Sequence, residues 1–402
     1  MKKVLIFISC FMILIPTLIR AEEITTINTD NTESNESSSD GVNLAENAAS
    51  AILIDASTGQ ILFEKNAHEK LAPASMTKIM SMLIIVESIE KGIINWDDMV
   101  TASANASGMG GSQILLETGE QMKVEDMFKG IAVASGNDAV VALAEAIAGT
   151  TDEFVKMMND KVKELGLTDT NFKNPHGLDD ANHYSSAYDM AMIAKELVKH
   201  EKVLEFTSIY EDYLRKGTSK EFWLVNTNKL VRFYNGVDGL KTGYTTEAGY
   251  CLTATAKKND MRLISVVMGE SSNGLRNTET QSMLDYGFAQ YKSTELVKKG
   301  DAVTEVEVEK AKKQKVTIVT KDNASILSKK TEKLGEITYE TKLDKIKAPV
   351  KSGDKIGTLK VKEDGKVIKE VDLTVKEDVE EANILELYLR YLSDMIVGNI
   401  KF

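Results

Sequence analysis

The pattern of apolar residues changes several times along this chain, and those changes constrain its fold more than any single motif. Two short apolar runs within residues 51–64 flank the turn residues 56–59, which predicts a β-hairpin. Helix-type spacing dominates between 79 and 200, strand-type runs return at 237–268, and a helix follows at 275–291. Strands separated by helices in this order predict an α/β (α+β) domain, with a mostly antiparallel sheet flanked by helices.

The C-terminal quarter of the chain has a different pattern. Short alternating runs with turn residues between them predict a small all-β domain, with strands at 303–308, 316–319, 337–340, 355–361 and 367–375. The final stretch, 381–402, has helical spacing and collects large apolar side chains on one side: Ile384, Leu385, Tyr388, Leu389, Leu392, Met395 and Ile396.

A chain of 402 residues exceeds the usual single domain, so we expect several units. The first two, a signal peptide and a linker, are expected to precede the folded part of the chain. The expected units are a signal peptide at 1–21, a disordered linker at 22–47, a helix-and-sheet domain at 48–292, a β-rich domain at 293–377 and an amphipathic helix at 380–402.

The N-terminus has the features of a secretory signal. Lys2 and Lys3 precede an apolar run from Val4 to Leu18, and Ala21 offers a small residue for cleavage. The cleavage site is imperfect, so an uncleaved N-terminal membrane anchor is the alternative, although the apolar run is short for a full span. Either reading predicts that the rest of the chain is exported.

Charge and cysteine content narrow the function further. The net charge is −12, from 49 basic and 61 acidic residues, which argues against nucleic acid as a main partner. Cys10 lies in the expected signal, so cleavage would leave Cys251 alone and allow no intrachain disulfide. Cys251 lies in a strand-like run and is expected to be a small buried hydrophobe rather than a nucleophile.

A serine and a lysine three residues apart stand at the start of a long apolar helix. In Ala72–Met80, Ser75 and Lys78 would share one helix face, so a lysine of lowered pKa could take the serine proton. The helix start also offers N–H groups to an oxyanion. The same spacing recurs at Ser88/Lys91 and Ser352/Lys355, where it has the ordinary reading of a capping serine and a solvated lysine.

Two further motifs follow in order. Ser135-x-Asn137 interrupts two apolar helices, and Lys241-Thr242-Gly243 lies in a predicted strand. Similar triplets occur at Ser103/Asn105, Ser271/Asn273 and Lys351-Ser352-Gly353. Only the set that begins with Ser75 and Lys78 falls, in order, on a helix start, an inter-helix break and a strand. This ordered triple is typical of penicillin-binding proteins and class A β-lactamases.

The residue types suit acyl transfer. Ser75 would attack a carbonyl, Lys78 would take its proton, Ser135 would relay a proton to the leaving amine, and Asn137 would fix Lys78 and the substrate amide. In the third motif, Lys241 would hold Lys78 neutral and attract a carboxylate, and Thr242 would bond that carboxylate. Gly243 would let a substrate backbone approach the strand. The N–H groups of Ser75 and Tyr244 would form the oxyanion hole.

From about Ala48 to Phe402, the chain resembles the low-molecular-mass penicillin-binding proteins that are D-alanyl-D-alanine carboxypeptidases of the S11 serine peptidase type. The stretches that carry the resemblance are Pro73–Lys78, Ala134–Ala139, Asn174–Leu178 and Asp238–Gly243. It implies a β-lactamase/transpeptidase-like domain, removal of the terminal D-alanine from the peptidoglycan stem pentapeptide, deacylation by water, and covalent inhibition by β-lactams. No cofactor is implied.

The chain departs from the family pattern in two places. Tyr244 stands where histidine is common in related enzymes, and Asn226-Thr227-Asn228 stands where some relatives have a carboxylate-binding arginine. Arg276 matches another family arginine and is a substrate-binding candidate near the Lys241 strand. Its alternative reading is a solvated residue at a helix start.

Four other functions compete with this one. His176 and Asp179 could suggest a metal site, but only four histidines exist, no metallopeptidase spacing occurs, and a loop packed under the site is the preferred reading. A β-lactamase is disfavoured because Asn174–Asp179 lacks the deacylating glutamate of class A enzymes. The same residues would also serve an endopeptidase that cuts peptidoglycan cross-links. A catalytically dead wall-binding protein is disfavoured by the intact triple.

The C-terminal helix has two readings. It could pack on the β domain, or lie in the outer face of the cytoplasmic membrane, which we favour because it is terminal and follows a complete β domain. Glu386, Arg390 and Asp394 interrupt the apolar run and argue against a full span. The polar side is not strongly basic, so binding should rest on apolar burial. We therefore expect an exported protein at the membrane and cell wall.

Overall fold

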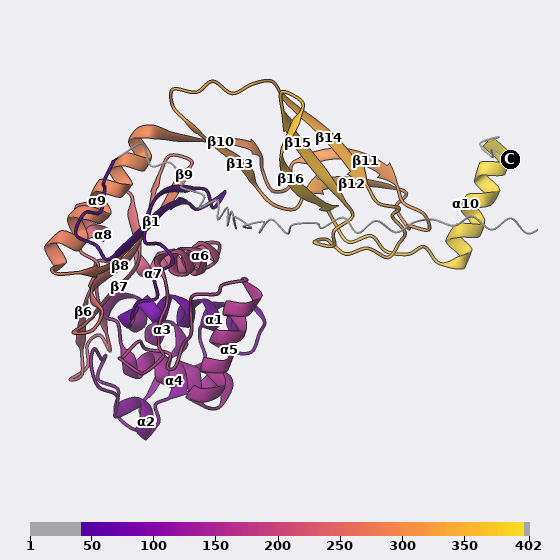
Figure 1. Ribbon diagram of the computed structural model, residues 1–402. Coiled ribbons are helices and arrows are strands. Elements are labelled where there is room, and N and C mark those ends of the chain that lie inside the picture. Colours follow the sequence, from indigo (N-terminus) through magenta and orange to yellow (C-terminus); the bar gives the residue numbers. More distant parts are fainter. Residues whose placement is uncertain (1–41, 398–402) are drawn as a thin grey trace, which may run out of the picture. The chain divides into compact units, whose positions relative to one another are not determined.

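The computed structural model describes residues 42–397; the expected signal peptide and most of the expected linker, at 1–41, and the last five residues lie outside this range. A five-stranded sheet is the frame of the N-terminal part (Figure 1), in the order β2-β1-β9-β8-β7 with every pairing antiparallel. Its strands are β1 (Ser50–Asp55), β2 (Ile61–Lys65), β7 (Val237–Thr245), β8 (Gly249–Lys258) and β9 (Met261–Glu270). The expected hairpin and the mostly antiparallel sheet are confirmed.

Alternation along the strands divides the buried residues between two faces of this sheet. Ile52 and Ile54 of β1 pack with the larger group of helices, whereas Ala51 and Leu53 pack toward α9 (Asn273–Gln290), where Met283 and Leu284 are buried. Successive side chains of a strand point to opposite faces, so one sheet holds two apolar layers. The sheet is therefore buried on both sides.

The larger face is covered by helices. They are η1 (Ala74–Thr77, a 3-10 helix), α1 (Lys78–Glu90), α3 (Val124–Ala134), α4 (Asn137–Ala148), α5 (Thr151–Glu164), α6 (Ala187–Leu197) and α7 (Glu201–Thr207). The helical spacing expected between 79 and 200 and the helix expected at 275–291 are confirmed. The break between α3 and α4 is shorter than expected, because Asn137 is already the first residue of α4.

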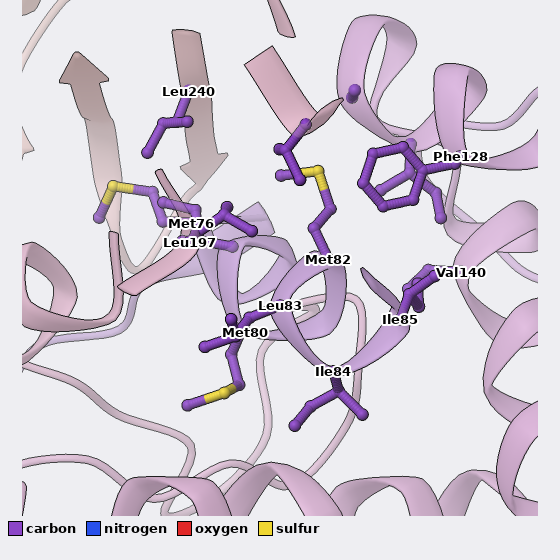
Figure 2. Packing of buried hydrophobic residues seen from close by; sticks show 14 of the residues in the cluster. Met76, Met80, Met82, Leu83, Ile84, Ile85, Phe128, Val140, Leu197 and Leu240 are labelled. Atoms are coloured by element: carbon purple, nitrogen blue, oxygen red, sulfur yellow. The ribbon is translucent and has the colours of Figure 1, made fainter. Parts of the chain in front are cut away.

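Helix α1 lies at the centre of this layer and is buried almost all round. Figure 2 shows its side chains among residues of four other elements: Phe128 of α3, Val140 of α4, Leu197 of α6 and Leu240 of β7. A helix that is apolar on every side belongs in a core. The methionines around Ser75 are core residues: Met76, Met80 and Met82 are fully buried.

Several short elements lie between the main ones, and the sequence did not indicate them. They are α2 (Ala104–Ser107), α8 (Leu230–Phe233) and two hairpins, β3 (Met99–Thr101) with β4 (Gln121–Lys123), and β5 (Glu211–Leu214) with β6 (Phe222–Val225). Thr227 and Asn228, which follow β6, lead toward the Lys241 strand: Asn228 Nδ2 donates to the carbonyl of Gly239 at 2.9 Å.

The C-terminal part is all-β up to its last helix, as expected. Five strands form a sheet in the order β11-β12-β16-β15-β14 over an apolar core that includes Ile318, Leu359 and Leu373. Two strands that were not expected form a separate ribbon, β10 with β13. The strands are β10 (Tyr291–Val297), β11 (Ala302–Glu307), β12 (Lys315–Thr320), β13 (Ala324–Lys329), β14 (Ile337–Leu343), β15 (Gly357–Glu363) and β16 (Lys366–Val375).

Helix α10 (Ile384–Val397) follows the β-rich part and confirms the expected terminal helix over the described residues. Large apolar side chains of this helix are exposed, among them Ile384 at 87% and Leu385 at 65%. No helix within residues 42–397 has the length and apolarity needed to cross a membrane. Residues Gly398–Phe402, the end of the expected helix, lie outside the described range.

Candidate active site

Ser75 and Lys78 stand at the junction of η1 and α1. Ser75 lies on the 3-10 turn rather than inside the α-helix, and Lys78 is the first residue of α1. The turn is entered through Ala74, whose φ of 49° is unusual for a residue with a side chain. The side-chain nitrogen of Lys78 lies 3.3 Å from the Ser75 hydroxyl oxygen. The serine and its expected base are therefore in contact.

Lys78 is fully buried and held from three sides. Besides Ser75, its Nζ donates to Oδ1 of Asn137 at 2.6 Å and to the carbonyl oxygen of His176 at 2.7 Å. Burial lowers the pKa of Lys78 well below its ordinary value, and the nearby charge of Lys241 lowers it further, whereas Asp138 raises it. Burial disfavours an ammonium ion, so the surroundings of Lys78 favour its neutral form.

Ser135 and Asn137 come from the break between α3 and α4. Ser135 has a left-handed backbone, with a φ of 66°, and its buried hydroxyl has no hydrogen-bond partner in the described part of the chain. A strained residue with an unpaired buried group is often part of a functional site. Asn137 donates through Nδ2 to the carbonyl of Gly110 at 2.7 Å, which leaves its Oδ1 for Lys78.

The third motif lies on β7, the edge strand of the sheet. Lys241 is buried, and burial and the charge of Arg276 lower its pKa to about 7. Thr242 Oγ1 donates to Thr227 Oγ1 at 2.8 Å. Arg276 is also buried, on α9, and its guanidinium bonds Oδ1 of Asn277 at 3.0 and 3.2 Å. Two buried cationic side chains whose charges act on each other favour binding of an anion.

Gly243 and Tyr244 follow on the same strand. A Cβ on Gly243 would lie 2.8 Å from the carbonyl oxygen of Pro73 and 3.0 Å from Cβ of Ala74, so this glycine lets the strand pack on the Ser75 turn. That packing gives Gly243 a role that the sequence did not suggest. Tyr244 is 55% exposed and lies against Tyr250, with ring centroids 4.3 Å apart.

The loop Asn174–Leu178 packs under the site, as expected. Besides the His176 carbonyl that binds Lys78, the Pro175 carbonyl accepts a bond from the Ser81 hydroxyl at 2.6 Å. Burial lowers the pKa of His176 to about 3, and the charge of Lys78 adds to this effect. The imidazole is thus neutral, and the loop contributes its backbone to the site.

Some site residues carry no sequence signal. A backbone carbonyl such as that of His176 can belong to any residue type, so its role was not predicted. Asp138 lies within Ala134–Ala139, but the sequence assigned it no function. Its buried carboxylate follows Asn137 in the chain and raises the pKa of Lys78. A buried acid next to a motif residue is the signal that could have found it.

Comparisons with known proteins identify the family of this chain. Residues 34–272 match the D-alanyl-D-alanine carboxypeptidase family, peptidase S11, and residues 291–381 match the C-terminal domain of penicillin-binding protein 5. The D-alanyl-D-alanine carboxypeptidase DacF of Bacillus subtilis is 53% identical over 352 residues, which cover 87% of this chain and 90% of that protein.

Solved structures give the same result. Penicillin-binding protein 5 from Haemophilus influenzae is 35% identical, with a TM-score of 0.65, over 83% of this chain and 98% of that one. Penicillin-binding protein D2 from Listeria monocytogenes in its ampicillin-bound form is 30% identical, with a TM-score of 0.53, over 61% of this chain and 100% of that one. The chain belongs to the D-alanyl-D-alanine carboxypeptidases of peptidase family S11, hydrolases among the low-molecular-mass penicillin-binding proteins.

Proposed function

We propose that this protein removes the terminal D-alanine from peptidoglycan stem pentapeptides through an acyl-enzyme on Ser75. The observation that carries the proposal is the buried Lys78, whose Nζ lies 3.3 Å from the Ser75 hydroxyl and whose pKa is well below its ordinary value. A serine becomes a nucleophile when a positioned base takes its proton. Family membership supports the substrate class.

Each step uses residues of this site. The Ser75 oxygen bonds to the carbonyl carbon of the penultimate D-alanine while its proton passes to Lys78. The C–N bond to the terminal D-alanine breaks, and that amine leaves with a proton relayed through Ser135. The N–H groups of Ser75 and Tyr244 stabilise the oxyanion. Water then hydrolyses the ester, which frees Ser75 and the shortened peptide.

The substrate's terminal carboxylate is assigned to the electropositive side of the site. Lys241 and Arg276 are both buried there, and the Thr242 hydroxyl can turn toward an anion. Their charge also supports a neutral Lys78. A D-Ala-D-Ala end, which carries this carboxylate next to the scissile amide, fits such a pair of cations.

β-Lactams are proposed to acylate the same serine. The Listeria protein D2, 30% identical to this chain, has been crystallised with ampicillin. The loop Asn174–Asp179 offers no glutamate for rapid deacylation, so a long-lived adduct is expected rather than β-lactamase turnover. The corresponding role is control of cross-linking during cell-wall maturation.

The proposed location is outside the cytoplasmic membrane, at the cell wall. The N-terminal signal supports export, and the exposed apolar side chains of α10 support attachment to the membrane surface. Ile384, Leu385 and Leu389 would enter the interface between headgroups and acyl chains.

The central test digests diacetyl-L-Lys-D-Ala-D-Ala with the purified protein and detects released D-alanine by mass. Ser75→Ala should abolish both release and labelling by a fluorescent penicillin, and Lys78→Arg should be nearly inactive because arginine keeps its proton. Ser88→Ala is the control and should behave as the unaltered protein. Labelling that persists in Ser75→Ala, or fast β-lactam turnover, contradicts the proposal; release from cross-linked dimers would add an endopeptidase activity.

A further inference from the structure

Asp138 is a buried acid beside the site, and the mechanism above gives it no role. It is 1% exposed and is the second residue of α4. Its carboxylate accepts bonds from the backbone N–H of Ile114 at 3.0 and 3.1 Å, of Leu116 at 3.0 Å and of Ala139 at 2.9 Å. All of these are donors, which suits an ionised carboxylate. Within residues 42–397, no cationic side chain forms an ion pair with it.

The two N–H donors of Ile114 and Leu116 belong to a loop that crosses the start of α4. Asn137 is bound to the same loop twice. Its backbone N–H donates to the carbonyl of Ser112 at 2.7 Å, and its side-chain Nδ2 donates to the carbonyl of Gly110. A Cβ on Gly111 would lie 2.7 Å from Nδ2 of Asn137. The loop therefore sets which end of the Asn137 amide faces Lys78, and Asp138 fastens that loop.

The other side of this loop is held independently. The Arg215 guanidinium donates to the carbonyl of Ile114 at 3.0 Å and to the carboxylate of Glu120 at 2.5 Å. A change at Arg215 would loosen the loop but leave the Asp138 carboxylate in place. A variant of Arg215 is therefore a matched control, because it loosens the loop without removing the charge of Asp138.

We propose that Asp138 is a positioning residue for the base: its carboxylate fastens the Ile114–Leu116 segment, which orients Asn137, and stabilises the positive charge that Lys78 acquires from Ser75. The inference rests on the proposed function of Lys78. It assigns the buried acid to the step in which a cation forms inside the protein, where an uncompensated charge is costly.

The charged groups around Lys78 oppose one another. Lys241 on β7 lowers the pKa of Lys78, Asp138 on α4 raises it, and His176 in the loop is neutral because its own pKa is about 3. Arg276 on α9 acts through Lys241. Removing the charge of Asp138 leaves Lys241 unopposed, so the pKa of Lys78 falls further and the lysine becomes a weaker base.

The experiment measures the second-order rate of acylation by a fluorescent penicillin against pH, in the full chain. The unaltered protein should lose rate at acid pH as Lys78 is protonated. In Asp138→Asn, the midpoint of this limb should move to lower pH by about half a unit or more, and the plateau rate should fall about 10-fold, as expected for a weaker base. Arg215→Gln should lower the rate without moving the midpoint.

The outcomes separate the two claims. If the unaltered protein is not acylated at Ser75, the proposed function fails. If it is acylated but Asp138→Asn keeps its midpoint, or Arg215→Gln moves the midpoint equally, only the role of Asp138 fails. Asp138→Ser, which is neutral but keeps a hydrogen-bond acceptor, is a second variant with the same expected shift. If neither neutral variant folds, Asp138 serves folding alone and the proposal is overturned.

Discussion

Gly177 passes so close to the turn that carries Ser75 that a Cβ on it would lie 1.8 Å from the carbonyl oxygen of Ala74 and 2.9 Å from the backbone nitrogen of Ser75. Its φ of 84° is in the left-handed region as well. The loop that supplies the His176 carbonyl and the turn that carries Ser75 therefore touch backbone to backbone, and only glycine leaves the space.

A single methyl group at Gly177 should damage the site. In Gly177→Ala, the Ser75 turn or the loop must move by an ångström or more, and a shift of that size can cost ~100-fold in rate. We expect labelling by fluorescent penicillin to slow by about that factor. Gly166→Ala is the control, because Gly166 has a φ of 70° but nothing within 4 Å of the added carbon. Equal rates in Gly177→Ala and the unaltered protein would contradict the close contact.

The charge of Lys241 should control substrate binding as pH rises. Burial and Arg276 lower the pKa of Lys241 to about 7, so its ammonium is present below that pH and is lost above it. For a peptide with a free terminal carboxylate, kcat/KM should fall through an alkaline limb near pH 7, because the free enzyme loses a cation. An amidated peptide should lack that limb. If both peptides give the same profile, Lys241 does not bind the carboxylate.

Two buried carboxyl groups, Glu270 at the end of β9 and Glu279 on α9, should make stability depend on pH. Glu279 accepts bonds from the backbone N–H of Asn47 and Ala48, at 2.8 and 3.2 Å. Burial and the neighbouring Glu279 raise the pKa of Glu270 to about 8, well above the ordinary value of roughly 4.3. Glu270 therefore keeps its proton in the folded state across a range where the unfolded chain has lost it.

The sign of the effect follows from linkage. Between the two pKa values the folded state binds the extra proton, so the free energy of unfolding falls as pH rises and levels off near pH 8. Glu270→Gln cannot ionise and keeps an N–H donor for Glu279. Its midpoint of thermal unfolding should exceed that of the unaltered protein by an amount that grows from pH 5 to 8. Glu69→Gln, at an exposed position, is the control, and a constant difference across this range would refute the raised pKa of Glu270.

Truncation should test the role of α10. The cut belongs after Asn383, because Ala382 is buried and its N–H donates to the carbonyl of Lys310 at 2.8 Å. Removing residues 384–402 should release an active enzyme from membranes after signal cleavage, since binding rests on apolar burial.

A milder change tests the same surface. Leu385→Glu with Leu389→Glu places two charges among side chains that are 65% and 56% exposed, and it should also detach the protein, whereas exposed Ser393→Glu should not. If the truncated chain still sediments with membranes, the N-terminal segment is the anchor. If it unfolds, α10 is part of the β-domain core.

The sequence predicted the elements whose residues carry a pattern. The β1–β2 hairpin, the central helix and the Lys241 strand follow from apolar periodicity, and Ser75, Lys78 and Asn137 meet as their motif order suggested. Contacts made by backbone atoms were not predictable, because any side chain can accompany the carbonyl of His176. The left-handed Ser135 and the packing of Gly243 on Pro73 likewise depend on tertiary structure.

Elements with little apolar surface were also missed. Strands β5 and β6 alternate weakly, with Tyr213 and Trp223 paired on an exposed face. Burial decides strand formation more than intrinsic preference does. The same holds for β10 and β13, whose residues are mostly half-buried.

The strand order of the main sheet has a consequence for biosynthesis. Strand β1, made early, lies between β2 and β9, so its second neighbour is synthesised about two hundred residues later. Until Met261–Glu270 emerges, the β1–β2 hairpin has an open hydrogen-bonding edge, and the sheet that holds the Lys241 strand against the Ser75 turn is incomplete. Loop closure over such a distance is slow. A chain threaded through a translocation channel from its N-terminus would therefore have an incomplete sheet, and no complete site, until most of it has crossed.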